Sequence, residues 1–186
     1  MQTDVLFIHS AGSQSGGQGS SPLLKHLRDG LGTAYNIISP KMPAPTKPSY
    51  ERWKQELDKQ FSKNNSVPIL IGHSLGGSVL LKYLSEQRHE IQIAGLFIIA
   101  APYWGSEGWK VEEFILKNDF AKYLPAETKI YLYQSDDDEV VPIDHLTFYS
   151  KTIPNSIIRK LDVGGHTFKD GLTELVLDIK QFSKMS

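Results

Sequence analysis

The chain has 186 residues, 40% of them hydrophobic, and its 20 Lys and Arg residues nearly balance 21 Asp and Glu residues. This length and composition fit one globular domain, and a net charge of -1 does not favour a nucleic-acid-binding surface. The absence of cysteine excludes disulfides, thiol catalysis and cysteine metal sites. The N-terminus does not read as a secretion signal, and the longest apolar run, residues 93–101, is too short for a membrane span. We therefore expect a cytoplasmic protein.

Short apolar runs alternate with longer amphipathic segments along the chain. The apolar runs predict strands, and the segments with apolar residues three or four positions apart predict helices. Ser21, followed by Pro22, is the expected cap of the first helix. The expected strands lie at residues 5–8, 35–38, 67–71, 93–100, 129–133 and 157–161. The expected helices begin at residue 21, cover 50–61, 75–87 and 171–182, and include one after the acidic run at 136–139.

This alternation is typical of an α/β protein with three layers, in which helices cover both faces of a sheet. We expect a mostly parallel, doubly wound sheet of about six strands. Right-handed crossovers would bring the C-terminal ends of the strands to one edge, where ligands usually bind. Residues 1–186 are predicted to form a single domain, and residues 102–128 to form a small cap-like insertion with one short helix.

Residues 72–76 read G-H-S-L-G and lie between an expected strand and an expected helix. A strand, a sharp turn and a helix are the setting of a nucleophile elbow. In that turn Ser74 would have a strained backbone that exposes its Oγ atom, and Gly72 and Gly76 would let the strand and helix pack closely. The helix N-terminus supplies free N–H groups. Ser74 is therefore the candidate nucleophile, and the N–H of Leu75 a candidate oxyanion donor.

A serine nucleophile needs a base, and a third group that orients the base. An acidic run follows the fifth expected strand. We expect Asp138 to be the orienting acid, because the Val-Val-Pro sequence that follows can hold its carboxylate inward. Asp137 is the alternative, and an exposed turn or helix cap is the non-catalytic interpretation. His166 follows the last expected strand and two glycines, and is the expected base.

The loop after the first strand is expected to complete the oxyanion hole. The N–H of Ala11 is the first choice for this donor, and Ser10 is the second. The glycine-rich stretch at 13–20 lacks the lysine of a phosphate-binding loop and a dinucleotide fingerprint, so nucleotide binding is not expected.

The remaining candidates are histidines and aromatic residues near the expected site. His9 is expected to shape the loop after the first strand. Side chains expected to border the substrate are Ser10, His73, Tyr103 and Trp104, although His73 is also interpreted as a packing neighbour of the nucleophile and the aromatic rings as staples of the cap. Histidines expected on the surface are His26, His89 and His145.

Taken together, these residues resemble the α/β-hydrolase fold, and most closely its small single-domain serine hydrolases of the retinoblastoma-binding-protein type. The segments that carry the resemblance are 7–10, 72–77, 100–102, 137–142 and 164–166. The resemblance implies a carboxylic-ester hydrolase with Ser74 as nucleophile, Asp138 as acid and His166 as base, and with no metal or organic cofactor. Ser10 departs from the pattern, because many hydrolases of this fold have glycine at that position.

The reaction implied is two-step acyl transfer through an acyl-enzyme. The short cap favours small esters as substrates, so the expected partner is a small molecule and neither nucleic acid nor membrane. No protein partner is predicted. Two alternatives keep the same fold: a thioesterase, amidase or peptidase with the same triad, and a binding protein without catalysis.

Overall fold

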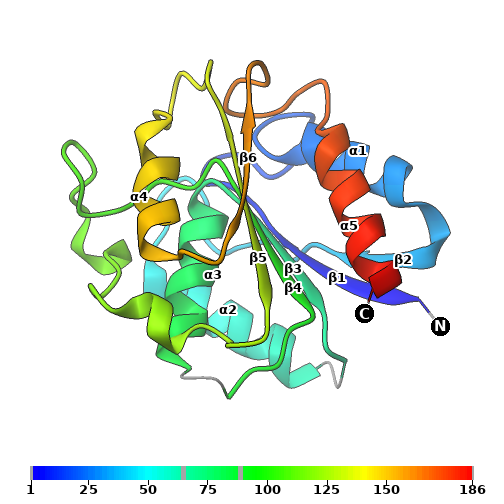
Figure 1. The fold of residues 1–186 in the computed structure, drawn as a ribbon, viewed down its shortest axis with the longest axis horizontal. Helices are drawn as coiled ribbons and strands as arrows, with labels where there is room; N and C mark the ends of the chain where they lie inside the picture. The colour runs from blue at the N-terminus through cyan, green and yellow to red at the C-terminus, as the bar shows by residue number, and fades with distance from the viewer. Residues whose placement is uncertain (1, 64–65, 88–89, 186) are drawn as a thin grey trace.

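The computed structural model describes residues 2–63, 66–87 and 90–185. In this part of the chain six parallel strands form one sheet with the order β2-β1-β3-β4-β5-β6 (Figure 1). The strands are β1 (Thr3–Ile8), β2 (Tyr35–Ile38), β3 (Ile69–His73), β4 (Gly95–Ile99), β5 (Lys129–Ser135) and β6 (Ile157–Leu161). The predicted α/β fold with a parallel sheet is confirmed.

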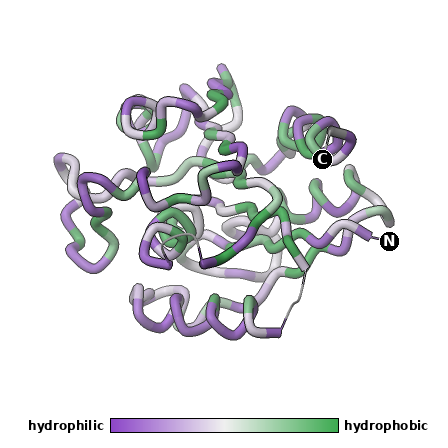
Figure 2. The backbone as a smooth tube through the Cα atoms, turned by 60° about the horizontal axis from the view of Figure 1, so that its bottom comes forward, coloured by the Kyte–Doolittle hydropathy of each residue, from purple (hydrophilic) through white to green (hydrophobic). Residues whose placement is uncertain are grey.

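Helices cover both faces of this sheet. They are α1 (Ser21–Leu31), α2 (Tyr50–Lys63), α3 (Leu75–Glu86), α4 (Asp144–Thr152) and α5 (Thr173–Met185), with short 3₁₀ turns η1 (Gly32–Ala34), η2 (Glu112–Phe114) and η3 (Phe120–Tyr123). Helices α1 and α5 pack on one face, whereas α2, α3 and α4 pack on the other (Figure 1). Apolar colouring runs along the central strands, and the outer helices alternate between polar and apolar residues (Figure 2).

Strand β1 shows how the sheet separates two hydrophobic cores. Val5 and Phe7 belong to the cluster under α1 and α5, and Leu6 and Ile8 belong to the cluster under α2 and α3. All four side chains are at most 3% exposed. Burial of each contributes about 1.5–3 kcal/mol, and burial on both faces explains why the strand reads as a continuous apolar run.

Some boundaries differ from the prediction for identifiable reasons. Strand β3 begins at Ile69, since Pro68 has no N–H for the ladder. The N-cap of α1 is Ser20 and not Ser21, and the Ser20 hydroxyl makes no cap hydrogen bond. The segment 102–128 contains two 3₁₀ turns, η2 and η3, in place of one helix, and both contact α3.

Candidate active site

Strand β3, Ser74 and helix α3 form a sharp elbow at the C-terminal edge of the sheet. Ser74 has φ 54° and ψ −123°, a backbone conformation that costs a non-glycine residue about 1–3 kcal/mol. The Ser74 N–H donates to the carbonyl of Ile99 on the neighbouring strand at 2.7 Å. The surrounding structure therefore holds the serine in the strained geometry expected from the sequence.

The glycines of the elbow are required by close contacts. A Cβ atom on Gly76 would lie 2.4 Å from the carbonyl oxygen of Ile8 and 2.5 Å from that of His9. A Cβ atom on Gly72 would lie 2.6 Å from the Cα atom of Gly77. Helix α3 can begin directly against the ends of β1 and β3 only because these positions lack side chains.

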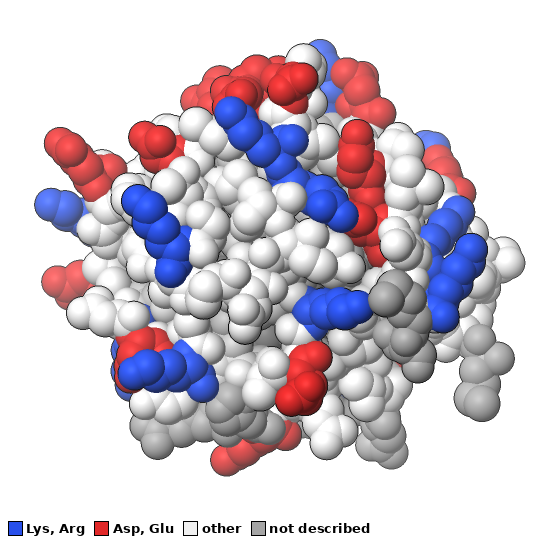
Figure 3. Space-filling view, viewed as in Figure 1, with Lys and Arg blue, Asp and Glu red and all other residues white. Residues whose placement is uncertain are grey.

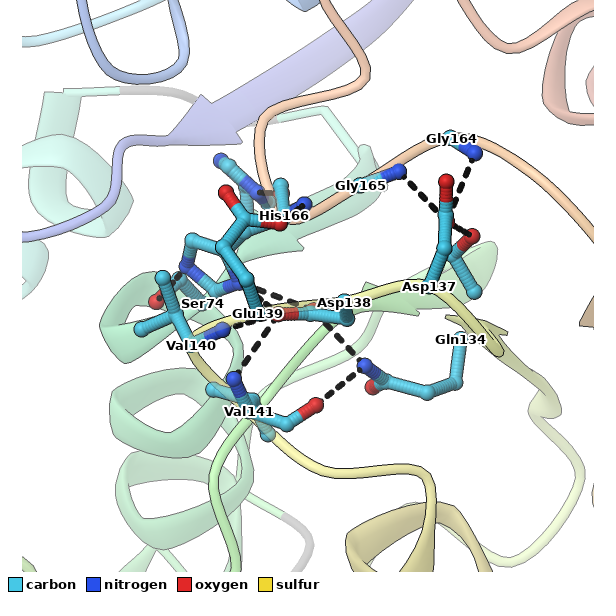
Figure 4. A network of polar contacts seen from close by, with 12 residues as sticks. Ser74, Gln134, Asp137, Asp138, Glu139, Val140, Val141, Gly164, Gly165 and His166 are labelled. Carbon is cyan, nitrogen blue, oxygen red and sulfur yellow. Dashed lines mark hydrogen bonds and ion pairs between the residues drawn. The ribbon is translucent and has the colours of Figure 1, made fainter.

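Three loops bring Ser74, His166 and Asp138 into one hydrogen-bonded chain (Figure 4). The Oγ atom of Ser74 lies 2.9 Å from Nε2 of His166, and Nδ1 of His166 lies 2.9 Å from Oδ2 of Asp138. Each of the three residues is at most 9% exposed. An ionised carboxylate only accepts hydrogen bonds, so neutral His166 has its proton on Nδ1 and its Nε2 accepts the Ser74 hydroxyl.

The carboxylate of Asp138 is held by several donors. Oδ1 accepts the N–H groups of Val140 and Val141 at 2.8 Å each, and Oδ2 accepts the Gln134 side-chain amide at 2.7 Å (Figure 4). Burial alone would raise the pKa of Asp138, but hydrogen bonds from His166 and these N–H groups hold the pKa below its ordinary value. Asp138 is therefore ionised at neutral pH. Gln134 was not predicted; its only signal is a polar residue near the end of a buried strand.

The other acidic residues of this loop bind the backbone next to His166. Oδ1 of Asp137 accepts the N–H of Gly164 at 2.9 Å and that of Gly165 at 2.8 Å, and Oε2 of Glu139 accepts the N–H of His166 at 3.3 Å (Figure 4). Asp137, the alternative acid, thus makes hydrogen bonds to the glycines before His166, whereas Asp138 binds the imidazole. The acidic run is neither a free turn nor a helix cap.

The two expected oxyanion donors are the backbone N–H groups of Leu75 and Ala11. Leu75 is the first residue of α3, and Ala11 lies in the exposed loop after β1. Among the described residues neither N–H has a hydrogen-bond acceptor. The second-choice donor, the N–H of Ser10, donates instead to Oγ of Ser20 at 2.8 Å, so it is already satisfied.

The side chains of Ser10 and His73, which were expected to border a substrate, are both buried and hydrogen-bonded to Ser20. His73 is 0% exposed; its Nδ1 lies 2.8 Å from Oγ of Ser20 and its Nε2 lies 2.7 Å from the carbonyl oxygen of His166. Ser10 is 5% exposed, and its Oγ lies 3.0 Å from Oγ of Ser20. Ser20 was not predicted as a site residue, since a serine in a glycine-rich stretch carries no specific signal.

Tyr103 and Trp104 are half-buried at the start of the segment 102–128. The N–H of Tyr103 donates to Nδ1 of His145 at 2.7 Å. The ring of Trp104 packs against Trp109 and Phe114, with ring centroids 5.2 Å apart in each pair. His145 was expected on the surface, but it is buried, with 4% of its surface exposed. These contacts fix the segment to the core and leave part of each ring exposed.

The remaining histidines lie outside this chain of contacts. Nε2 of His9 lies 2.8 Å from Oγ of Ser39, and His26 is half-buried beside Gly171. His89 lies outside the described residues. Within residues 2–63, 66–87 and 90–185, no group of three His, Asp or Glu side chains is placed to hold a metal ion. No helix in this part of the chain has the length and hydropathy needed to cross a membrane.

Comparison with known proteins places the chain among enzymes of one family. A family model described as "Serine hydrolase" matches residues 16–181. The putative hydrolase YdeN of Bacillus subtilis is 25% identical over 160 residues, covering 83% of this chain and 81% of YdeN. The crystal structure of the ydeN product has a TM-score of 0.71 at 17% identity, covering 98% of this chain and 100% of that one. CarC, a serine hydrolase involved in carbazole degradation, has a TM-score of 0.76 at 15% identity, covering 99% and 92%. The fold is that of the α/β-hydrolases, and the chain belongs to the serine hydrolase family.

Proposed function

We propose that this protein hydrolyses small carboxylic esters through an acyl-enzyme formed on Ser74. The observation that supports the proposal is the buried chain of hydrogen bonds from Ser74 through His166 to Asp138. Its proton positions suit general-base catalysis, since Nε2 of His166 accepts from the serine and Nδ1 donates to the carboxylate. The finer family assignment, to the retinoblastoma-binding-protein type, is part of this proposal and is supported by the same residues.

In the first step, Oγ of Ser74 bonds to the ester carbonyl carbon while its proton passes to Nε2 of His166. The carbonyl oxygen becomes an oxyanion, which the N–H groups of Leu75 and Ala11 stabilise; loss of one such donor typically costs about 10²–10³ in kcat. The ionised carboxylate of Asp138 stabilises the imidazolium. The tetrahedral intermediate then collapses, and His166 gives the proton to the departing alkoxide, which leaves as the alcohol.

In the second step, a water molecule loses a proton to Nε2 of His166 and attacks the acyl carbon. Collapse of this second intermediate breaks the bond to Oγ of Ser74, which recovers the proton from His166 as the carboxylic acid departs. The proposed preference for small esters rests on Tyr103 and Trp104. The N–H of Tyr103 binds His145 of α4, and the ring of Trp104 packs against Phe114. These contacts hold the start of the 102–128 segment in place, so we expect it not to open for a long acyl chain.

Labelling with a fluorophosphonate probe tests the proposal. We expect covalent labelling of the parent protein at Ser74, and loss of labelling and esterase activity in Ser74→Ala and His166→Ala. A folded parent that is neither labelled nor active would overturn the proposal and favour a binding protein.

Substrate preference is tested with p-nitrophenyl esters of increasing acyl length, and with matched thioester and anilide substrates. We expect the highest kcat/KM for short-chain esters. A higher kcat/KM for long-chain esters would contradict the size preference, and a higher value for the thioester or anilide would contradict the reaction class.

A further inference from the structure

A second chain of buried polar groups runs behind the proposed catalytic residues. It begins at Ser10, passes through Oγ of Ser20 and the ring of His73, and ends at the backbone carbonyl of His166. The groups are nearly inaccessible: Ser20 and His73 are 0% exposed, and Ser10 is 5% exposed. The chain lies behind the proposed triad and meets it at the backbone of His166.

The proton positions in this chain follow from its two ends. The carbonyl of His166 only accepts, so the ring proton of His73 is on Nε2 and its Nδ1 is an acceptor. The single proton of the Ser20 hydroxyl must then point to Nδ1 of His73. Ser20 Oγ then accepts the N–H of Ser10. Because the only proton of Ser20 is already used, the 3.0 Å contact between the two hydroxyl oxygens requires the Ser10 hydroxyl to donate. Each donor therefore has an acceptor, and only this direction satisfies all of them.

The ring of His73 must be neutral for this arrangement. Burial, and next the neighbouring His166, lower the pKa of His73 to about 3, which outweighs the opposite effect of the His166 carbonyl. The ring therefore has one proton throughout the neutral pH range, and that proton is the one donated to the His166 carbonyl.

We infer that His73 is a positioning residue, which acts with Ser20 to set the backbone of the His166 loop and of the Ser10–Ala11 loop relative to Ser74. His73 directly precedes the nucleophile, its Nε2 binds the carbonyl of the proposed base at 2.7 Å, and its Nδ1 reaches the oxyanion loop through Ser20. One rigid ring thus links the three loops that meet in the proposed reaction. The inference rests on the proposed function for its catalytic consequence.

The geometry assigns separate tasks to the two ring nitrogens. Nε2 fixes the backbone of His166 and so places its imidazole on Ser74. Nδ1 orients the Ser20 hydroxyl, which leaves Oγ as the acceptor for the N–H of Ser10 and so fixes the backbone that leads into Ala11. This also explains serine at position 10, because its hydroxyl completes the hydrogen bonding of Ser20.

Two substitutions at position 73 separate these tasks. In His73→Gln the amide nitrogen can occupy the position of Nε2 and donate to the His166 carbonyl. In His73→Asn the shorter side chain places its amide at the position of Nδ1, which keeps the Ser20 contact and loses the contact with His166. Both variants are neutral and polar, so a difference between them reports on which contact is kept. Ser20→Ala removes the link to Ser10 and leaves the His166 contact in place.

We expect kcat on a short p-nitrophenyl ester to fall on the order of 100-fold in His73→Asn, with KM nearly unchanged, because a small displacement of the base has this effect. His73→Gln, which keeps the His166 contact and loses the Ser20 contact, should lower kcat by only about tenfold. Ser20→Ala should lower kcat by about tenfold through the oxyanion loop. The melting temperatures of the two His73 variants should be similar. Equal losses of kcat in His73→Asn and His73→Gln, or losses that simply follow the melting temperature, would overturn the inference.

Proton NMR tests the same inference without any substrate. The Nδ1 proton of His166, shared with Asp138, should give a far-downfield signal that is kept in His73→Gln and shifted or lost in His73→Asn. An inactive parent would refute the proposed function but would leave this comparison intact. The same signal in the parent and in both variants would refute the positioning role, whether or not the parent hydrolyses esters.

Discussion

The carboxylate of Asp137 accepts the backbone N–H of Gly165 at 2.8 Å, directly before the proposed base. The same oxygen accepts the N–H of Gly164, and Glu139 accepts the N–H of His166. Neighbouring carboxylates repel each other, and hydrogen bonds from Ser135 and then from Gly165 lower the pKa of Asp137, so it remains ionised. Asp137 and Glu139, the two neighbours of Asp138 in the chain, therefore bind the backbone of the histidine loop, while Asp138 binds the imidazole.

Replacing Asp137 tests this backbone contact. Asp137→Ala removes the acceptor for both glycine N–H groups, so we expect kcat to fall by about tenfold or more as the loop loses its orientation. Asp137→Asn keeps an oxygen in place and should retain most of the activity. The measurement is kcat and KM on a short ester. Parent-like activity in Asp137→Ala, or equal losses in both variants, would show that the contact does not position the loop.

Asp138→Asn should be far more damaging than its small change in shape suggests. With the amide oxygen facing the Val140 and Val141 N–H groups, the new NH₂ group faces Nδ1 of His166 and the amide nitrogen of Gln134. His166 must then keep Nδ1 unprotonated, and its Nε2 cannot accept the serine proton. We expect kcat to fall by about 10⁴-fold, as for the corresponding change in a known triad.

A matched control for this substitution is Asp136→Asn. Asp136 is exposed and pairs with Lys160 at 2.7 Å, away from the imidazole. Its kcat should remain close to that of the parent. If Asp138→Asn kept more than about a tenth of parental kcat, the orienting role of Asp138 would be wrong.

The stability of the protein should fall as the pH is lowered from 7 to 5. His73 has a pKa of about 3 when folded and an ordinary value of 6.5 when unfolded, so the unfolded chain binds a proton that the folded chain excludes. The contribution of neutral His73 to the free energy of unfolding is therefore fully present above pH 6.5. It is lost progressively below that pH, by about 1.4 kcal/mol per pH unit. His9, whose pKa is lowered to about 4 by burial and by Arg28, acts in the same direction.

Urea unfolding at several pH values measures this effect. The free energy of unfolding of the parent should decrease by about 2 kcal/mol between pH 7 and pH 5 from His73 alone. His73→Gln has no titrating group at this position, so its dependence on pH should be shallower. Parallel curves for the parent and His73→Gln would show that His73 is not kept neutral by the fold.

The parts of the molecule that could be predicted from the sequence are those that depend on local patterns. The strand, the glycines and the strained serine of the elbow are contiguous, and the apolar runs identify a sheet buried on both faces. The hydroxyl of Ser20 lies 53 residues from its partner His73 in the sequence. The Gln134 amide donates to Asp138 because the loop after β5 folds back toward the strand. No periodicity connects such positions, so these supporting contacts require the folded structure.

The choice between Asp137 and Asp138 illustrates the same limit. Both follow β5, and the sequence distinguishes them only through the apolar residues that come next. In the structure Oδ1 of Asp138 accepts two N–H groups from those residues, which points the carboxylate inward, while Asp137 is left to bind the glycine loop. The Val-Val-Pro sequence therefore distinguishes the two acids, because the backbone N–H groups of Val140 and Val141 bind the carboxylate of Asp138.

The elbow should not tolerate a methyl group at Gly76. Its Cβ atom would lie 2.4 Å from a backbone oxygen of Ile8, and neither β1 nor α3 can move without breaking sheet or helix contacts. We expect Gly76→Ala to destabilise the protein by about 3 kcal/mol or more, measured by urea unfolding. Gly108→Asn is the control, because nothing lies within 4 Å of that position and asparagine tolerates its positive φ. Similar stability of both variants would contradict the close approach.

Acidic side chains gather over the loops that follow β5 and β6, at the top of the molecule in Figure 3. The exposed members are Asp136, Asp137, Glu139, Asp162 and Asp170. Because Asp137 and Glu139 bind the loop of the proposed base, their charges lie close to the site and should repel an anionic substrate.

We therefore expect a lower kcat/KM for a short ester that carries a free carboxylate than for a neutral ester of the same size. The difference should shrink at high salt, since the Debye length is about 3 Å at 1 M and interactions between exposed charges farther apart than that are largely screened. Asp162→Asn, which removes one exposed charge of this group, should also reduce the difference. An anionic ester that is hydrolysed as fast as the neutral one at low salt would show that this acidic surface does not influence substrate choice.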